Sequence, residues 1–252
     1  MMWTISYGQC PHNAQTRPVS KSFFSVRFYT FYILKCNYLE FEATLKNFLE
    51  STRGDEFLFS AEKQIDLHIN AGREIGRRIH NYAAAYLSVI DHSRGVYKHL
   101  SESKSEQFQD FAKEYDAKRK EHFSNSFENV FVGDLRRYLQ HKKVAVPVLS
   151  TRMERIQDSS SESESNLFNI SYSFEFKSNE IKDFKWSSQS RDYINQNRAI
   201  PIADIISQHF STMKAFYQWF EFRDYQARPV VADEIKKATF EEWQSMNLSK
   251  LI

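Results

Sequence analysis

Residues 75–100 contain the pattern that most limits the fold of this chain. Apolar side chains recur there at every third or fourth position and stay on one narrow face for about seven helical turns. Asn70 is suited to cap this helix at its start, and Ala83, Ala84 and Ala85 let other helices approach closely. The residues of the face are Ile75, Ile79, Tyr82, Tyr86, Val89, Ser93, Tyr97 and Leu100. The pattern predicts one long amphipathic helix.

The composition also favours helices. The 252-residue chain has only 6 Gly and 5 Pro, which disfavours a turn-rich β-sandwich and favours long helices. Hydrophobic residues make up 41% and charged residues 26%, so a chain of this length buries a core without covalent or metal staples. The net charge is only +2. Any surface that attracts nucleic acid must therefore be a local one.

Further helices are predicted on both sides of the long one, because apolar residues recur at helical spacing. Pro147 ends any helical continuation before it, Pro201 is suited to open the last long helix, and Pro229 ends it. The predicted ranges are 38–50, 108–122, 127–141, 187–195 and from 201 to before 229. A short docking helix that carries Phe240 and Trp243 is expected after that.

Two segments alternate with the period of a β-strand. Residues 168–176 alternate strictly between apolar and polar side chains. Residues 23–34 are rich in aromatics and alternate less regularly, although a helix of the same residues is possible. Residues 56–69 are ambiguous, because residues 65–69 alternate like a short strand. The predicted fold class is mainly α, a helical bundle with a small accessory antiparallel β element formed by 23–34 and 168–176.

We predict a single helical domain over residues 21–230. Residues 1–20 show no periodicity and are expected to form a flexible N-terminal tail. Residues 153–166 are polar and low in complexity, which is typical of a mobile loop, and residues 231–252 are expected to be a C-terminal docking segment. The sequence shows no signal peptide and no apolar run of about 18 residues. We therefore expect a cytoplasmic protein without membrane contact.

Motifs for most kinds of catalysis are missing. The chain has no glycine-rich phosphate loop, nucleophile elbow or paired-cysteine metal knuckle, and its 8 histidines show no HExxH spacing. We therefore predict neither a metal site nor a cofactor. An Arg and a His five positions apart remain, as Arg136 and His141. Because Arg94 and His99 have the same spacing, spacing alone does not select the site.

The surrounding segments single out Arg136 and His141. They read NYAAAYLSVIDHSR at 81–94 and FVGDLRRYLQHKKVAVPV at 131–148. Together with the charged helix between them, they resemble the HEPN superfamily (higher eukaryotes and prokaryotes nucleotide-binding). The resemblance covers about residues 70–150, and within the superfamily it is to uncharacterised bacterial proteins with a late "LRNYxQH" segment. It implies an HEPN-like helical bundle.

The family's signature is an Arg, a polar residue and then a His, and it falls on Arg136, Arg137 and His141. Arg137 stands where Asn is usual, and Lys142 and Lys143 follow the His in place of the Tyr that some members carry. The resemblance implies a metal-independent endoribonuclease that forms a homodimer, with the Arg and the His lining a shared cleft. It also implies a toxin or phage-defence role in a bacterium, with RNA and an antitoxin-like protein as partners.

In this ribonuclease hypothesis, His141 acts as general base or acid on a ribose 2′-hydroxyl. Arg136 holds the scissile phosphate and the charge that develops on it. The residues that would attract the RNA backbone are Arg137, Lys142 and Lys143. The supporting residues, from the preceding long helix, would be Asp91 and His92, which fit an ordinary solvated helix face as well.

A purely structural role explains the same residues. Positions five apart on a helix diverge by about 140°, so Arg136 and His141 converge only if the helix ends before His141 or if two subunits build the cleft. Asp134 and Arg137 would form an exposed pair worth roughly 0.2–0.5 kcal/mol, and the basic residues would sit favourably at a helix C-terminus. The alternatives to a ribonuclease are a catalytically silent module that binds RNA, nucleotide or a protein partner, and an aromatic-rich dimerisation protein.

Overall fold

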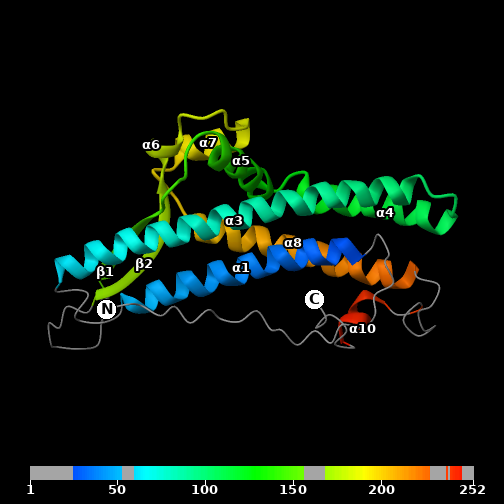
Figure 1. The fold of residues 1–252 in the computed structure, drawn as a ribbon, viewed down its shortest axis with the longest axis horizontal. Helices are drawn as coiled ribbons and strands as arrows, with labels where there is room; N and C mark the ends of the chain where they lie inside the picture. Colours follow the sequence, from blue (N-terminus) through cyan, green and yellow to red (C-terminus); the bar gives the residue numbers. More distant parts are fainter. Residues whose placement is uncertain (1–24, 53–59, 156–167, 228–236, 238, 246–252) are drawn as a thin grey trace.

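The computed structural model describes residues 25–52, 60–155, 168–227, 237 and 239–245, and Figure 1 shows their arrangement. The fold is mainly helical with a small three-stranded antiparallel sheet, which confirms the predicted fold class. The helices are α1 (Ser25–Ser51), α3 (Ala61–Ser101), α4 (Glu106–Phe123), α5 (Phe127–His141), α6 (Ser178–Ile181), α7 (Ser188–Gln196), α8 (Ile202–Ala227) and α10 (Phe240–Ser245). The strands are β1 (Val148–Arg155), β2 (Phe168–Lys177) and β3 (Ala199–Ile200). The predicted tail 1–20 and most of the predicted loop 153–166 lie outside the described residues.

The long predicted helix is present as α3, and it begins earlier than expected. Ser60, not Asn70, is its N-cap, and the Ser60 hydroxyl accepts a hydrogen bond from the backbone N–H of Lys63 at 3.3 Å. Residues 65–69, which the sequence pattern left ambiguous, are therefore helical and not a strand. Ile65 and Ile69 lie one helical turn apart and are both exposed, so their alternation does not reflect burial of one sheet face.

The strand predicted at 23–34 is also wrong from Ser25 onward, because α1 covers this segment. The buried apolar side chains described in this region are Phe31, Leu34, Tyr38 and Phe41, and their spacing of three or four is that of a helix. This helical stripe is continuous with the correctly predicted helix at 38–50. One helix of 27 residues therefore replaces the expected strand and helix.

The sheet joins different partners from those predicted. β2 confirms the strand expected at 168–176, but it pairs antiparallel with β1, in a register that places Ser150 opposite Ser173. Its last residues pair with β3, where Phe176 lies opposite Ile200. Because residues 25–34 are helical, they offer no strand edge to β2, and the predicted pairing of the two is wrong.

Three long helices form the body of the molecule. α1, α3 and α8 run along its long axis, while α5, α6 and α7 lie on one side of α3 (Figure 1). Aromatic rings join α1 to α8, where the centroids of Tyr38 and Phe210 are 3.9 Å apart. The predicted docking helix is present as α10, and its fully buried Trp243 packs against Phe222 of α8.

Two glycines of α3 let another segment pass close to the helix axis. The chain between α5 and β1 crosses α3 there, so a Cβ atom on Gly72 would lie 2.9 Å from the Pro147 carbonyl oxygen. A Cβ atom on Gly76 would lie 3.1 Å from the carbonyl oxygen of Ala145. A contact of 2.9 Å leaves no room for a methyl group next to backbone. The crossing therefore fixes the end of α5 and the start of β1 against α3.

Candidate nucleic-acid interface

The predicted site residues lie on α5, whose position is set by an apolar face. Ser126 caps its first turn by accepting the backbone N–H of Asn129 at 3.2 Å. Phe131 and Leu135 are fully buried and hold the helix in the bundle. The helix ends at His141, so the expected clustering of basic residues at a helix C-terminus is present, where the helix dipole favours positive charge.

Arg136 is the least satisfied of the predicted residues. Its side chain is only partly exposed, and its Nε atom is buried without a hydrogen-bond partner. No ion pair to Arg136 occurs in the part of the chain that the structure describes. A buried donor without an acceptor costs about 1–3 kcal/mol.

His141, Lys142 and Lys143 are all exposed. Within the described ranges, none of the three forms an ion pair. The structure does not bring Arg136 and His141 together in one chain. Both lie on the regular helix α5, where residues five apart point about 140° away from each other, and no hydrogen bond joins these two described side chains. An Arg–His pair would therefore need a second copy of the chain.

Asp134 and Arg137 form the predicted pair, but Asp134 is buried rather than exposed. Its carboxylate also accepts the backbone N–H of Ser187 at 3.0 Å and the Ser187 hydroxyl at 2.6 Å. Burial raises the pKa of Asp134, but the hydrogen bonds from Ser187, Ser190 and Arg137 outweigh it and hold the pKa below its usual value. Asp134 therefore fixes the start of α7, where Ser187 is the N-cap residue.

The crossing at Gly72 brings a cation from α3 toward this end of α5. Arg73 follows Gly72 and is exposed, and it makes no ion pair with the described residues. The neighbouring carboxylate of Glu74 pairs with Arg77 and Arg78. Lys143 is four residues from Pro147, at most about 14 Å of extended chain. We call the residues around this point the α5-end surface. They are the exposed residues Arg73, His141, Lys142 and Lys143.

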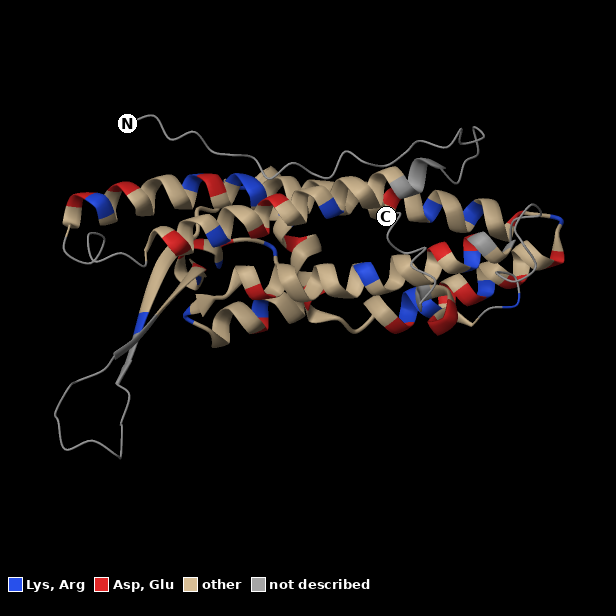
Figure 2. Ribbon diagram, turned by 90° about the horizontal axis from the view of Figure 1, so that it is seen from below, with Lys and Arg blue, Asp and Glu red and all other residues tan. Residues whose placement is uncertain are grey.

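The basic residues of α4 differ from those of the α5-end surface, because they are paired with acidic side chains. Each cation of α4 from residue 113 to 120 is matched by a carboxylate one turn away. The pairs are Lys113–Asp110 at 2.9 Å, Lys118–Glu121 at 2.9 Å, Arg119–Asp116 at 2.8 Å and Lys120–Asp116 at 2.7 Å. Figure 2 shows Lys and Arg alternating with Asp and Glu at this end of the bundle. Unpaired positive charge therefore distinguishes the α5-end surface from α4.

Asp91 and His92 do not lie near the α5-end surface of the same chain. Two contacts show that α5 runs antiparallel to α3. Tyr86 of α3 donates its hydroxyl hydrogen to Asn129 near the start of α5, while Gly76, earlier in α3, lies beside the segment that follows the end of α5. Residues 76 and 91 are 15 positions apart, about 22 Å along α3. Both side chains are exposed, and Asp91 pairs with Arg94 at 3.1 Å.

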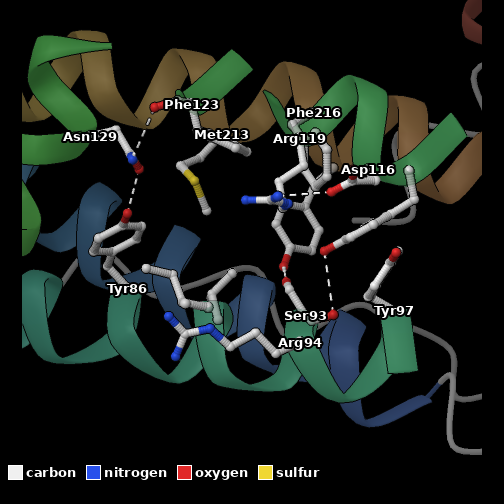
Figure 3. Close-up of a pocket in the computed structure, with 14 residues that line it drawn as sticks. Tyr86, Ser93, Arg94, Tyr97, Asp116, Arg119, Phe123, Asn129, Met213 and Phe216 are labelled. Carbon is white, nitrogen blue, oxygen red and sulfur yellow. Dashed lines mark hydrogen bonds and ion pairs between the residues drawn. The ribbon is translucent and has the colours of Figure 1, made fainter. Parts of the chain in front are cut away.

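A hollow that the sequence patterns did not predict lies between α3, α4 and α8 (Figure 3). It has a volume of about 470 Å³. Tyr86, from α3, and Asn129, from α5, close one end of it, and Arg94 and Arg119 reach it from α3 and α4. The signal available in the sequence was the predicted face of the long helix, of which Tyr86, Val89, Ser93 and Tyr97 line the hollow.

Comparisons with known proteins do not assign the chain to a family. No family model matches it, and no significant match was found among curated proteins or solved structures. No helix in the described ranges is both long and apolar enough to cross a membrane. Among the same residues, no group of three or more His, Cys, Asp or Glu side chains is placed to hold a metal ion.

Proposed function

We propose that this protein is a helical RNA-binding module that holds the phosphate backbone on the α5-end surface. One observation carries the proposal. Three exposed cationic side chains from two segments of the chain, namely Arg73, Lys142 and Lys143, form no ion pair with the described residues. Lys and Arg side chains that neutralise phosphates release condensed counterions, and this release drives binding. The resemblance to HEPN proteins supports RNA as the ligand.

A metal-independent endoribonuclease is our second proposal. It is favoured by Arg136, whose partly exposed side chain forms no ion pair with the described residues, and by His141, which is exposed at the end of the same helix. In this mechanism the imidazole of His141 takes the proton from a ribose 2′-hydroxyl, whose oxygen bonds to the adjacent phosphorus while the bond from phosphorus to the 5′-oxygen breaks. The leaving 5′-oxygen takes a proton from water, and the products are a 2′,3′-cyclic phosphate and a 5′-hydroxyl. Arg136 stabilises the negative charge on the phosphate. The two residues diverge on α5, so the proposal requires a homodimer in which Arg136 of one copy meets His141 of the other.

Binding is tested by titrating a labelled single-stranded RNA at several salt concentrations. We expect the affinity to fall with salt, by a slope of about 0.7 per phosphate contact on logarithmic axes. The double substitution Lys142→Ala and Lys143→Ala should weaken binding and reduce the slope. The matched control is Lys113→Ala with Lys118→Ala on α4, where both lysines are paired with acids. Equal loss in both variants, or no RNA binding at low salt, would contradict the proposal.

Cleavage is tested separately, with metal ions chelated. A ribonuclease should cut RNA as the wild type and lose activity in His141→Ala, while His68→Ala, on the first turns of α3, should retain it. The fold of each variant is checked by circular dichroism. Activity that survives in His141→Ala would remove this residue from the mechanism. RNA binding without any cleavage would leave the first proposal in place and exclude the second.

A further inference from the structure

We propose that the cavity between α3, α4 and α8 is a binding site for a small, flat aromatic anion. This site is separate from the α5-end surface. Asn129 lies at the cavity, and His141 lies 12 residues further along α5, about 18 Å away. The cavity volume of about 470 Å³ falls within the range of roughly 300–1,000 Å³ that is typical of small-molecule sites. A ligand with one or two fused rings fits that space.

The walls of the cavity present mainly aromatic rings to a ligand, because most of the polar atoms of its tyrosines are already hydrogen bonded. The hydroxyl groups of Ser93 and Tyr217 are 2.6 Å apart and hydrogen bond to each other. Tyr115 donates its hydroxyl hydrogen to the Ser93 carbonyl oxygen at 3.4 Å, and Tyr86 donates to Asn129. These groups are partnered within the protein, so the tyrosines present mainly their rings to a ligand. Aromatic rings stack on other aromatic rings in offset or edge-to-face geometry.

The cavity also carries positive charge that a ligand can reach. Arg94 and Arg119 line it from opposite helices (Figure 3). A guanidinium has five N–H donors, and the pairs of these arginines with Asp91 and Asp116 leave donors for a ligand. Asp116 is shared with Lys120 at 2.7 Å. Asp91 balances Arg94, whereas Asp116, which itself lines the cavity, is shared by two cations, Arg119 and Lys120. One positive charge is therefore left over, and an anionic group on the ligand is favoured.

Anilinonaphthalene sulfonate is a suitable probe, because it is an aromatic anion with a flat two-ring naphthalene and its fluorescence rises on binding. We expect saturable binding of one probe per chain to the wild type. N-phenylnaphthylamine has nearly the same rings without the sulfonate and should bind at least about tenfold more weakly. Equal affinity for the charged and the uncharged probe would overturn the proposal, and so would the absence of saturable binding.

Variants locate the binding site. The double substitution Arg94→Gln and Arg119→Gln should weaken binding of the anionic probe by about tenfold or more. Arg77→Gln is the matched control, because Arg77 pairs with Glu74 on α3 as Arg94 pairs with Asp91, but it does not line the cavity. Binding that is unchanged in the double variant, or reduced equally in the control, would place the probe elsewhere and overturn the proposal.

A steric variant provides a second readout. Ile90 lines the cavity and is only partly buried, so Ile90→Trp should fill the space with an indole ring and abolish saturable binding. Retained affinity in a folded Ile90→Trp protein would contradict the site. RNA binding at the α5-end surface should be unaffected by all of these changes. The cavity proposal is therefore tested by probe binding and the proposed function by RNA binding, so the failure of one is distinguished from the failure of the other.

Discussion

The hydroxyl oxygen of Tyr82 on α3 lies 2.6 Å from Nδ1 of His209 on α8, and both side chains are fully buried. Burial lowers the pKa of His209 to about 3, so the imidazole is neutral in the folded protein. An unfolded histidine has a pKa of about 6.5. Between these two values the unfolded chain binds more protons than the folded one, so stability falls as the pH falls below about 6.5.

The first prediction follows from that difference. We expect the free energy of unfolding to decrease by about 1.4 kcal/mol for each pH unit below about 6.5, as measured by urea denaturation between pH 7.5 and pH 5. His209→Gln keeps a hydrogen-bonding side chain without this titration and should flatten the slope. His92→Gln, at an exposed position of α3, should leave the slope unchanged. If the free energy of unfolding of His209→Gln falls with pH as steeply as that of the wild type, another group causes the pH dependence.

The second prediction concerns the crossing of α3 by residues 145–147. Gly72→Ala should destabilise the protein by about 1–3 kcal/mol, because the added methyl group overlaps the Pro147 carbonyl. Gly133→Ala on α5 is the control, since nothing lies within 4 Å of a Cβ atom there. It should be neutral or stabilising by up to about 1 kcal/mol, the usual gain of Ala over Gly in a helix. Similar effects of both substitutions on the denaturation midpoint would argue against the close contact.

The third prediction concerns Asp134. Asp134→Ala should cost about 1–3 kcal/mol of stability, because it leaves the backbone N–H of Ser187 without its acceptor. Asp110→Ala removes a carboxylate from an exposed pair and should cost less than about 1 kcal/mol. The pKa of Asp134 is lowered in the folded state, so its contribution is present above about pH 4 and is lost as the pH falls further. The wild type should therefore lose more stability than Asp134→Ala on acidification in that range.

The fourth prediction tests the α3 contribution to the α5-end surface. Arg73→Gln should weaken RNA binding and reduce its salt dependence by about 0.7 on logarithmic axes, as expected for the loss of one phosphate contact. Arg77→Gln, four residues further along α3, should have a smaller effect, because Arg77 is held by Glu74. Both variants are measured with the same RNA. If Arg77→Gln weakened RNA binding more than Arg73→Gln, ion pairing within the protein would not determine which arginine contacts the RNA.

Helices were predictable here where one face is buried continuously. Ile75, Ile79 and Tyr82 are buried at the positions that the helical spacing predicts. The strand at 23–34 was mispredicted because aromatic residues occupy both faces of α1. The same sequence therefore fits both the period of two residues typical of a strand and the period of 3.6 residues typical of a helix. Tyr29 and Ile33 are exposed there despite being large and apolar. β1 was not predicted, because its sequence is short and largely polar.

The candidate site was predictable only as a local cluster on α5. The sequence indicated that Lys142 and Lys143 follow the end of a helix, and in the structure they come directly after α5, which ends at His141. It contained no signal that links them to Arg73, because that proximity depends on how residues 145–147 cross α3. It also did not show that Asp134 is buried, since its second partner, Ser187, is 53 positions away.

The small residues at 72 and 76 have a consequence for natural variation. Proteins that share this arrangement of α3 and the segment after α5 should keep Gly at position 72, where the backbone of the crossing segment is closest. Position 76 has slightly more room and should admit Ala before any larger residue. A homologue with a bulky side chain at both positions would have to lift the crossing segment from α3, and its basic residues would then face a different part of the surface.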